Sequence, residues 1–329
     1  MAAYRLDGAR INTGTGPARE PSELFSLTRL RVLAAVAEHG SVTAAAAALH
    51  YAQPSVSHHL ARLEAETGAV LTQRVGRGLR LTEAGRVLAT RATEILGRVA
   101  AAQDELAEHT GLRSGRVRLA AFPSALGTLV PAAAARLRAA HPDLALELTE
   151  VEPPEALALL RAGEVDAAVV FRYLDDPAGE AAGPTALAVP GEDAGVDQVR
   201  LDELTTEPLH LVGPAGTDWA DELAEHRDAD WIAGCERCRN HLLWLCQRAG
   251  FTPRIRFSTD DYVAAQALVV AGLGMTVLPD LALRAYRHPD VRTRPLPGSV
   301  RRVLLARYGR PPDPPGVIAL ARALRATSD

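Results

Sequence analysis

Apolar and polar residues alternate at helical spacing from Leu27 to Gly68, with two short interruptions. Ser41 precedes the alanine-rich run 42–49, whose low helix cost favours a compact second helix. A polar turn follows that run, and Pro54 then stands where the first turn of another helix begins, so that its missing N–H costs nothing. The pattern therefore predicts three consecutive helices, of which the last ends at Gly68.

The third predicted helix has one apolar and one polar face. Val56, Leu60 and Leu63 recur at positions i, i+4 and i+7 and therefore share a buried face. The opposite face carries polar side chains: Ser55, His58, Arg62 and Glu66. Ser, His and Arg side chains can hydrogen-bond in a DNA groove, and the N–H groups at a helix start favour phosphate. This arrangement is typical of a recognition helix in the DNA major groove.

An arginine-rich hairpin is predicted after this helix. The segments Val70–Leu71 and Leu79–Leu81 flank a stretch with glycines at positions 76 and 78, which permit a tight turn. Arginines stand on and beside the turn at positions 74, 77 and 80. Such charges often only solvate a hairpin, but here they follow a recognition helix, so we expect phosphate or minor-groove contact. Three helices and this hairpin predict a winged helix-turn-helix.

One long helix is predicted from Thr82 to about Gly111. Its apolar residues alternate at spacings of four and three, which is a heptad seam: Leu88, Ala92, Ile95, Val99, Ala102 and Leu106. At about 1.5 Å per residue the helix spans roughly 40 Å. The seam is either an ordinary core-facing stripe or a contact with a partner helix. Because little else in the first 110 residues can cover it, we expect a dimer, followed by a hinge at 111–115.

Strand and helix patterns alternate in the rest of the chain. The first unit has the order βαβαβ: Arg116–Phe122, Leu126–Ala140, Leu144–Val151, Pro154–Ala162 and Val165–Phe171. This order predicts a parallel sheet with right-handed crossovers. A second α/β unit is predicted from Pro208, with these elements: Leu209–Val212, Asp218–Glu225, Trp231–Ile232, Arg239–Ala249, Arg254–Ser258 and Asp261–Ala271.

The chain is then predicted to return to the first unit. Gly274–Pro279 is expected to be the return crossing, Val303–Arg307 to rejoin the first sheet and Val317–Arg325 to form a closing helix. A chain that leaves one lobe, builds another and returns creates a cleft at its crossings. Small ligands bind in such clefts and at the carboxyl ends of parallel strands.

Composition narrows the class of protein further. The 329 residues suffice for two or three domains, and no run of 18 apolar residues predicts a membrane span. Residues 1–21 lack the apolar core of a signal peptide, so the cytoplasm is the expected compartment. The whole chain has a net charge of −4, but residues 27–90 alone carry a net charge of about +3. A weakly basic N-terminal segment followed by an acidic remainder suits a protein that binds DNA through the N-terminal segment alone.

The segment 30–85 resembles the N-terminal domain of LysR-type transcriptional regulators. The resemblance runs without a gap over these residues: Leu30, Arg31, Val36–Ala45, Leu49, Gln53–Ser57, Leu63, Glu64, Thr67, Gly68, Leu71, Arg74 and Leu81–Gly85. The chain departs from the family at His59, where Gln is frequent, and at Thr72, where Phe is usual. A looser resemblance to the family's effector-binding domain rests on the strand order, the turn 250–253 and the segment 271–279.

The resemblance implies a winged helix-turn-helix, a linker helix and a two-lobed α/β effector-binding domain similar to periplasmic solute-binding proteins. The expected boundaries are a disordered extension at 1–24, a DNA-binding domain at 25–84, a linker or dimerisation helix at 85–112 and an effector-binding domain at 113–329. Within that domain, lobe I is expected at about 116–178 and 275–329, and lobe II at about 179–274. The implied partners are double-stranded DNA, a small-molecule effector, a second copy in a dimer or tetramer, and RNA polymerase.

Two sets of site residues follow. The expected DNA contacts are Gln53, Pro54, Ser55, Ser57, His58, Arg62, Arg74 and Arg77. The expected effector contacts are Ser124, Glu152, Gly213 and Cys235. Ser124 could instead cap a helix, and Glu152 could be an exposed loop carboxylate. The identity of the effector does not follow from these residues, and no cofactor is expected.

All three cysteines lie in one short segment. Cys235 and Cys238 form a C-x-x-C pair, His241 follows, and Cys246 lies in an apolar helical stretch. The pair raises three alternatives: structural thiols, a thiol sensor, or a metal site. A metal would have at most three ligands here, whereas structural zinc sites have four. The sequence contains no G-x-S-x-G, no P-loop and no G-x-G-x-x-G after a strand, so catalysis is not predicted.

Overall fold

The computed structural model describes residues 25–75, 78–109, 115–174, 199–216, 219–220, 222–309 and 311–327. The chain divides into two compact units, residues 1–96 and 97–329, and each is described here by itself. The predicted N-terminal extension, the tip of the predicted hairpin at 76–77 and the hinge residues 111–114 lie outside the described residues.

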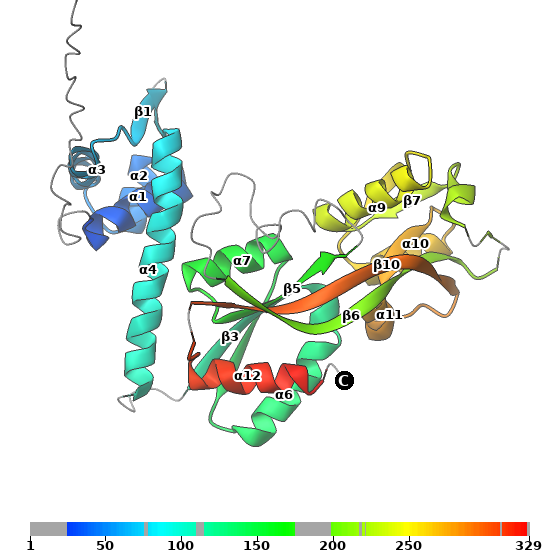
Figure 1. The fold of residues 1–329 in the computed structure, drawn as a ribbon. Helices are drawn as coiled ribbons and strands as arrows, with labels where there is room; N and C mark the ends of the chain where they lie inside the picture. The colour runs from blue at the N-terminus through cyan, green and yellow to red at the C-terminus, as the bar shows by residue number, and fades with distance from the viewer. Residues whose placement is uncertain are drawn as a thin grey trace, which may run out of the picture. The chain divides into compact units, whose positions relative to one another are not determined.

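The first unit contains the predicted helices and hairpin. Its elements are α1 (Leu27–His39), α2 (Val42–Ala48), α3 (Gln53–Thr67), β1 (Thr72–Val75), β2 (Gly78–Leu81) and the beginning of α4 (Glu83–His109) (Figure 1). The Ser41 hydroxyl caps α2 by accepting the Ala44 N–H at 3.1 Å. Gly40 and Gly68 end α1 and α3 in the left-handed conformation. The predicted order of three helices and a hairpin is confirmed.

A carboxylate fixes the hairpin to the third helix. The Glu64 carboxylate accepts the Leu71 N–H at 2.8 Å, the Thr72 N–H at 2.9 Å and the Thr72 hydroxyl at 3.1 Å. On the other side of the hairpin, α4 approaches so closely that a Cβ on Gly85 would lie 2.0 Å from the Leu71 carbonyl oxygen. The hairpin is therefore held by the end of α3 and the beginning of α4.

The second unit is built on a six-stranded mixed sheet. Its strands are β3 (Arg116–Ala121), β4 (Ala145–Glu150), β5 (Ala167–Tyr173), β6 (Val199–Pro214), β9 (Thr276–Pro279) and β10 (Val291–Tyr308). They lie in the order β4-β3-β5-β10-β6-β9. β3 is parallel to β4 and β5, as predicted, whereas β10 is antiparallel to both β5 and β6.

Helices cover both faces of this sheet in one lobe. Helices α6 (Leu129–Ala140) and α12 (Pro315–Arg325) lie on one face, and α7 (Pro153–Ala162) lies on the other (Figure 1). Alternate residues of each strand point to opposite faces. Leu119 and Val169 therefore join the core under α6 and α12, whereas Ala120 and Val170 join the core under α7. Burial on both faces explains the continuous apolar run in β5.

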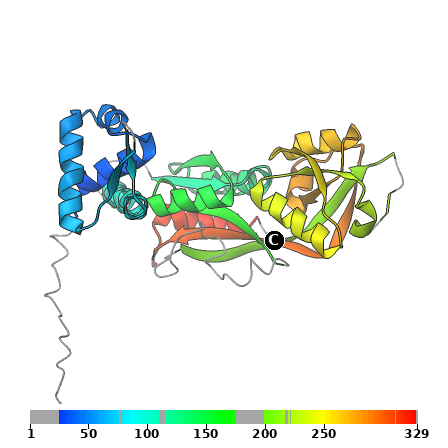
Figure 2. The same ribbon diagram turned by 90° about the horizontal axis from the view of Figure 1, so that it is seen from above.

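The second lobe stands at the far end of the two longest strands. It contains β7 (Asp230–Ala233), the parallel β8 (Arg254–Ser258), α9 (Glu236–Arg248), α10 (Tyr262–Val270) and α11 (Asp280–Ala285). Figure 2 shows these elements gathered at one end of β6 and β10, with α6, α7 and α12 at the other. The lobe has a core of its own beneath α10 and α11.

Two predictions about this lobe are wrong. β9 is not the return crossing, because it pairs with residues 209–212 of β6 inside the second lobe. The return is made by β10, whose residues 291–295 pair with β6 in the second lobe and whose residues 300–308 pair with β6 toward the first. The predicted helix 218–225 is also wrong: the described residues there form a short 3₁₀ turn, η3 (Leu223–His226). No helix among the described residues is long and apolar enough to cross a membrane.

Candidate functional site

The polar face of α3 is exposed from Gln53 to Arg62. Val56, Leu60 and Leu63 are buried, as predicted. The six residues expected to contact DNA from this helix all have exposed side chains: Gln53, Pro54, Ser55, Ser57, His58 and Arg62. Glu66 differs from them, because its carboxylate lies 2.8 Å from Nε of Arg29 on α1. The exposed face thus carries hydroxyl, amide, imidazole and guanidinium groups, while the acid at its end is bound to α1.

The hairpin places further arginines beyond the recognition helix. β1 and β2 pair antiparallel from Thr72–Leu81 to Val75–Gly78. Arg74 lies in β1, and Arg80 lies in β2 with an exposed side chain. Arg77 lies outside the described residues, so its expected DNA contact stays a prediction. Together, α3 and this two-stranded wing form a winged helix-turn-helix, which is a DNA-binding structure.

A cavity that is partly open to solvent lies between the two lobes of the second unit. Its walls come from the ends of β3 and β5, the beginnings of α9 and α10, and parts of β9 and β10. Three of the four expected effector contacts line it: Ser124, Glu152 and Cys235. They meet because each follows the carboxyl end of a parallel strand, where ligand sites form in α/β folds.

Gly213, the fourth expected contact, is placed elsewhere. It lies near the end of β6, where the Trp219 ring covers it so closely that a Cβ would be 2.8 Å from the indole. The expectation that Gly213 lines the cavity is therefore wrong. The physical reason is the length of β6, which carries residue 213 past the cavity into the second lobe.

A buried ion pair forms one wall of the cavity. The Arg301 guanidinium lies 2.6 Å from the Glu207 carboxylate, and both side chains are almost completely buried. Arg301 also donates to the Ser124 hydroxyl at 3.1 Å, so Ser124 does not cap a helix here. The rings of Phe122 and Phe171 flank the guanidinium, with centroids 4.8 and 4.3 Å from its carbon. Ser124 is thus held by Arg301, whose charge is already balanced.

Glu152 precedes α7 and faces the cavity rather than open solvent. Its side chain is half-buried, so the alternative of an exposed loop carboxylate is not what the structure has. Burial raises the pKa of Glu152, and a hydrogen bond from the Cys235 thiol opposes that shift. A carboxyl group in this setting can exist in its neutral form closer to neutral pH than an exposed one.

The C-x-x-C pair is reduced, and its two thiols are in contact. Cys235 is the N-cap residue of α9, and its Sγ lies 2.9 Å from the Cys238 Sγ. The Cys238 N–H also points to the Cys235 Sγ, at 3.4 Å. Both residues line the cavity, whereas Cys246 is fully buried in the same helix and does not. Within the described part of the chain, no group of three His, Cys, Asp or Glu side chains is arranged to hold a metal ion.

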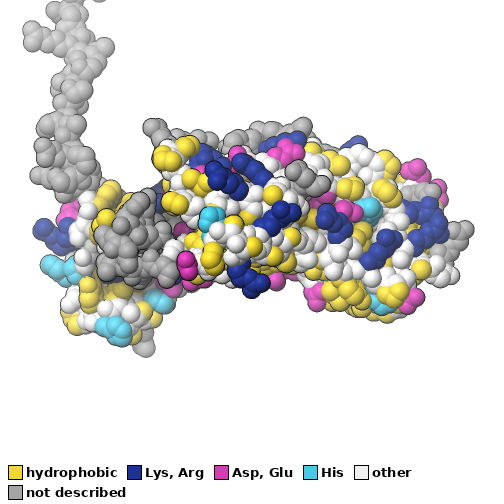
Figure 3. All heavy atoms as spheres, turned by 90° about the horizontal axis from the view of Figure 1, so that it is seen from below, with side chains coloured by type: hydrophobic (Ala, Val, Ile, Leu, Met, Phe, Trp, Pro, Cys, Tyr) yellow, Lys and Arg dark blue, Asp and Glu magenta, His cyan; other side chains and the backbone are white. Residues whose placement is uncertain are grey.

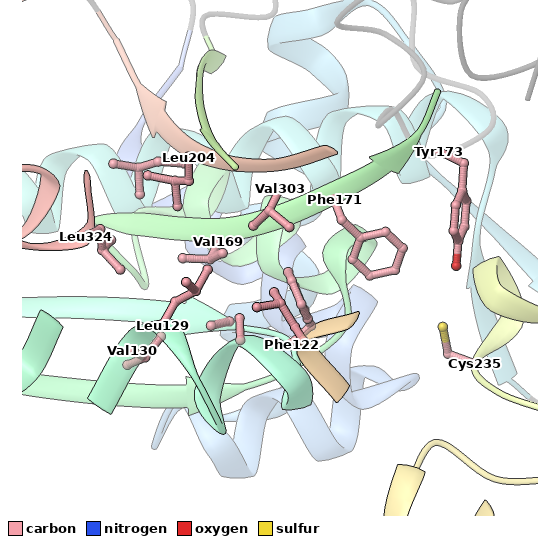
Figure 4. Packing of buried hydrophobic residues seen from close by; sticks show 14 of the residues in the cluster. Phe122, Leu129, Val130, Val169, Phe171, Tyr173, Leu204, Cys235, Val303 and Leu324 are labelled. Atoms are coloured by element: carbon pink, nitrogen blue, oxygen red, sulfur yellow. The ribbon is translucent and has the colours of Figure 1, made fainter. Parts of the chain in front are cut away.

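The surroundings of the two thiols make them unequal. Hydrogen bonds from the Cys235 thiol and the Tyr173 hydroxyl, with the charge of Arg301, lower the pKa of Cys238. The same sulfur–sulfur contact and burial raise the pKa of Cys235, and burial raises the pKa of Tyr173 well above its usual value. Figure 4 shows Tyr173 reaching from the end of β5 toward Cys235 at the start of α9. Cys238 is therefore the more acidic thiol of the pair, and Cys235 and Tyr173 are its proton-bearing neighbours.

Arg301 and Tyr173 escaped the sequence analysis, and His241 was considered there only as a possible metal ligand. Arg301 belongs to a strand that was expected to begin only at Val303, and Tyr173 lies two residues beyond the end predicted for β5. His241 stacks on Tyr173 with ring centroids 3.7 Å apart, and burial lowers its pKa to about 3. The antiparallel register of β10 and β5 sets Arg301 opposite Tyr173. No local pattern reveals such a pairing, because it joins residues far apart in the chain.

The first unit is thus a winged helix-turn-helix, and the second is an α/β domain with a cavity between its two lobes. Two family models match the chain: the LysR-family regulatory helix-turn-helix protein over residues 27–86, and the LysR substrate binding domain over 110–182 and 186–329. The chain belongs to the LysR family of transcriptional regulators. This confirms the resemblance and the expected fold class.

Relatives and solved structures agree with this assignment. The chain is 30% identical over 274 residues to the transcriptional regulator TfdS of Cupriavidus pinatubonensis, covering 80% of this chain and 85% of that one. It is 27% identical over 275 residues to OxyR of Escherichia coli, a DNA-binding transcriptional dual regulator, covering 81% and 83%. The crystal structure of CbnR, a LysR family regulator, superposes with a TM-score of 0.61 at 22% identity, covering 93% of this chain and 100% of CbnR.

Proposed function

We propose that this protein binds double-stranded DNA through α3 and the wing, and that a small molecule in the interlobe cavity controls its transcriptional output. The observation that carries the first half is the exposed polar face of α3 above a buried apolar face. A solved structure of CbnR in complex with its target DNA has the same fold, with a TM-score of 0.60. On this proposal Gln53, Pro54, Ser55, Ser57, His58 and Arg62 enter the major groove, while Arg74 and Arg77 contact the backbone or the minor groove.

DNA binding is tested on the region upstream of the protein's own reading frame, first by footprinting and then by fluorescence anisotropy at several salt concentrations. Arg62→Ala and Arg77→Ala each remove one cation, so we expect about a tenfold loss of affinity. A phosphate contact would also reduce the slope of log K against log salt by about one. Arg136→Ala, at an exposed position of α6, is the matched charge control. Unchanged affinity and salt slope in both variants would overturn the proposed interface.

The second half of the proposal rests on the cavity. A ligand that bridges the lobes favours their closure, and closure changes how the copies of an oligomer pack and how their recognition helices are spaced. N-ethylmaleimide attached to Cys238 places an uncharged group in the cavity. With Cys246→Ser as background, we expect the modified protein to protect a different length of DNA. An identical footprint with and without the label would contradict control through this cavity.

A redox- or metal-responsive regulator acting through Cys235 and Cys238 is the second candidate. The 2.9 Å sulfur–sulfur distance favours thiol chemistry, and several relatives at 25–27% identity are named hydrogen peroxide-inducible genes activators. Metal binding has less support, because the described residues offer no third ligand. Cys235→Ser and Cys238→Ser proteins that respond normally, with no metal found by elemental analysis, would eliminate this candidate.

A further inference from the structure

The charges around the cavity disfavour an anionic ligand. Among the described residues that line it, Arg301 is the one arginine, and its charge is balanced by Glu207 at 2.6 Å. Two carboxyl groups, Glu152 and Asp260, line the same space. A carboxylate ligand would meet these acids without gaining a free cation, and burying an unpaired charge is costly. The cavity therefore fits an uncharged molecule.

The shape and lining of the cavity suit an aromatic ring. Most of its surface is apolar, and five rings contribute to it: Phe122, Phe171, Tyr173, His241 and Tyr262. Phe122 and Phe171 meet edge to face with centroids 5.0 Å apart, so the wall is a fixed aromatic surface. A flat apolar ligand would bury more of its area here than a peroxide would.

A nucleophile stands in this apolar space with a proton donor beside it. Cys238 is the more acidic of the two thiols, and the Cys235 thiol is in contact with it at 2.9 Å. The other groups that face Cys238 are the Tyr173 hydroxyl, the Arg301 guanidinium and the Glu152 carboxyl. Thiolates are the reactive form of cysteine, so this pair is built for reaction with an electrophile.

We propose that the effector cavity takes an uncharged aromatic electrophile of the quinone class, and that Cys238 adds to it covalently. The inference rests on the proposed function, in which this cavity is the effector site. In the step, the Cys238 sulfur forms a bond to a ring carbon next to a carbonyl, and the ring C=C electron pair moves to the quinone oxygen. That oxygen takes the proton of the Cys235 thiol. The proton on the ring carbon that now carries sulfur then moves through solvent to the second carbonyl oxygen, which leaves a hydroquinone joined to Cys238 by a thioether and Cys235 as a thiolate.

Cys246 provides an internal control. It lies in the same helix but is fully buried outside the cavity, and burial raises its pKa to about 12. A reagent that attacks thiols without selection would modify Cys246 only after unfolding. Modification confined to Cys238 in the native protein would therefore report the cavity and its thiolate together.

The test compares two neutral electrophiles on the native, full-length protein. 2-Methyl-1,4-naphthoquinone carries a flat fused ring, and iodoacetamide has none. Adducts are located by peptide mass spectrometry, and rates are compared with those of N-acetylcysteine at the same pH. We expect a quinone rate that saturates with concentration, and a quinone-to-iodoacetamide ratio on Cys238 about tenfold above that of the free thiol, as a binding energy of about 1.4 kcal/mol would give. Cys246→Ser should react as the parent does.

Two further variants separate the roles of the thiols. Cys238→Ser should form no adduct, whereas Cys235→Ala should still react but with its pH profile shifted to higher pH, because Cys238 loses a hydrogen-bond donor. Three results would overturn the proposal: a quinone rate that never saturates, an adduct on Cys246, or faster oxidation of the pair to a disulfide by hydrogen peroxide than addition of the quinone.

These readouts are independent of DNA. If the quinone adduct forms on Cys238 but the DNA footprint does not change, the chemistry stands and the regulatory half of the proposed function fails. If the N-ethylmaleimide label changes the footprint while the quinone does not saturate, the cavity is the control site but its ligand is of another class.

Discussion

His241 is a histidine that the fold holds in its neutral form. Its ring stacks between Tyr173 and Trp244, and burial lowers its pKa to about 3. In the unfolded chain the pKa of His241 is near 6.5. Below that pH, His241 is protonated in the unfolded state but stays neutral in the folded state. The stabilising contribution is therefore complete above pH ~6.5 and decreases as the pH falls toward 3.

This difference gives a measurable pH dependence. We expect the free energy of unfolding to decrease below pH ~6.5 with a slope of up to about 1.4 kcal/mol per pH unit from this residue. His241→Phe keeps a ring in the stack and should flatten that slope in urea titrations between pH 4 and 7. His141→Phe, at an exposed position, is the matched control and should leave the slope as it is. An equal slope in both variants would contradict the assignment.

The buried Arg301–Glu207 pair is a second residue-scale feature with a clear consequence. Glu207 also accepts the Leu281 N–H at 2.6 Å, so it holds the start of α11 as well as the guanidinium. Glu207→Gln leaves a buried cation without its counter-charge, and we expect a loss of roughly 3–5 kcal/mol in unfolding free energy. The double variant Glu207→Gln with Arg301→Met should recover part of that loss in the same measurement. If it is no more stable than the single variant, the unpaired charge is not the cause.

At the scale of elements, the wing depends on the end of α3. Glu64 accepts three hydrogen bonds from Leu71 and Thr72, which fix where β1 begins. Glu64→Ala removes them, so we expect a loss of about 1–3 kcal/mol in stability of the first unit and weaker DNA binding through a less ordered wing. Glu38→Ala, at an exposed acid of α1, is the charge-matched control for both measurements. If the DNA affinity of Glu64→Ala is unchanged, the wing does not contribute to the DNA interface.

The elements also show why sequence patterns predicted some structures and missed others. Helices α1–α3 were predictable because each buries one stripe at fixed spacing and has its own cap or stop residue. The long strands β6 and β10 were not, since their polar residues are paired far along the chain: Arg200 and Arg307 both contact Asp313, and Arg307 also contacts Asp202. A strand that buries ion pairs lacks the apolar alternation by which strands are recognised.

The same reason limits what the sequence predicts about the cavity. Ser124, Glu152 and Cys235 follow parallel strands, so the end-of-strand rule finds them. Arg301 and Tyr173 meet through antiparallel pairing between β10 and β5, and Pro295, Pro297 and Gly298 obscure the strand that carries Arg301. Proline and glycine in a run argue against a strand, yet here they mark the irregularity between its two paired segments.

At the scale of the whole molecule, the second unit is organised around its crossings. On the face shown in Figure 3, arginines are interspersed with acidic and apolar side chains over the described part of this unit. Tyr173 comes from the first lobe, and His241 and Cys238 come from the second, so their contacts join the lobes beside the cavity. A ligand at this place can change the interlobe contacts directly.

The last property of the whole molecule is its expected dimerisation through the heptad seam of α4. Of the predicted heptad seam, Ala92 is buried within the first unit, whereas Ile95 and Leu106 are 38% and 65% exposed. Two apolar side chains at heptad spacing on one exposed face suit a second copy of the same helix.

We therefore expect Ile95→Glu with Leu106→Glu to convert a dimer to a monomer in light scattering, because each glutamate would be buried against its own symmetry mate. The operator affinity should fall as well, since one recognition helix reads only half of a palindrome. Val87→Glu, also exposed on α4 but about a quarter turn from the seam, should leave the mass unchanged. A double variant that remains dimeric would place the dimer contact on another surface.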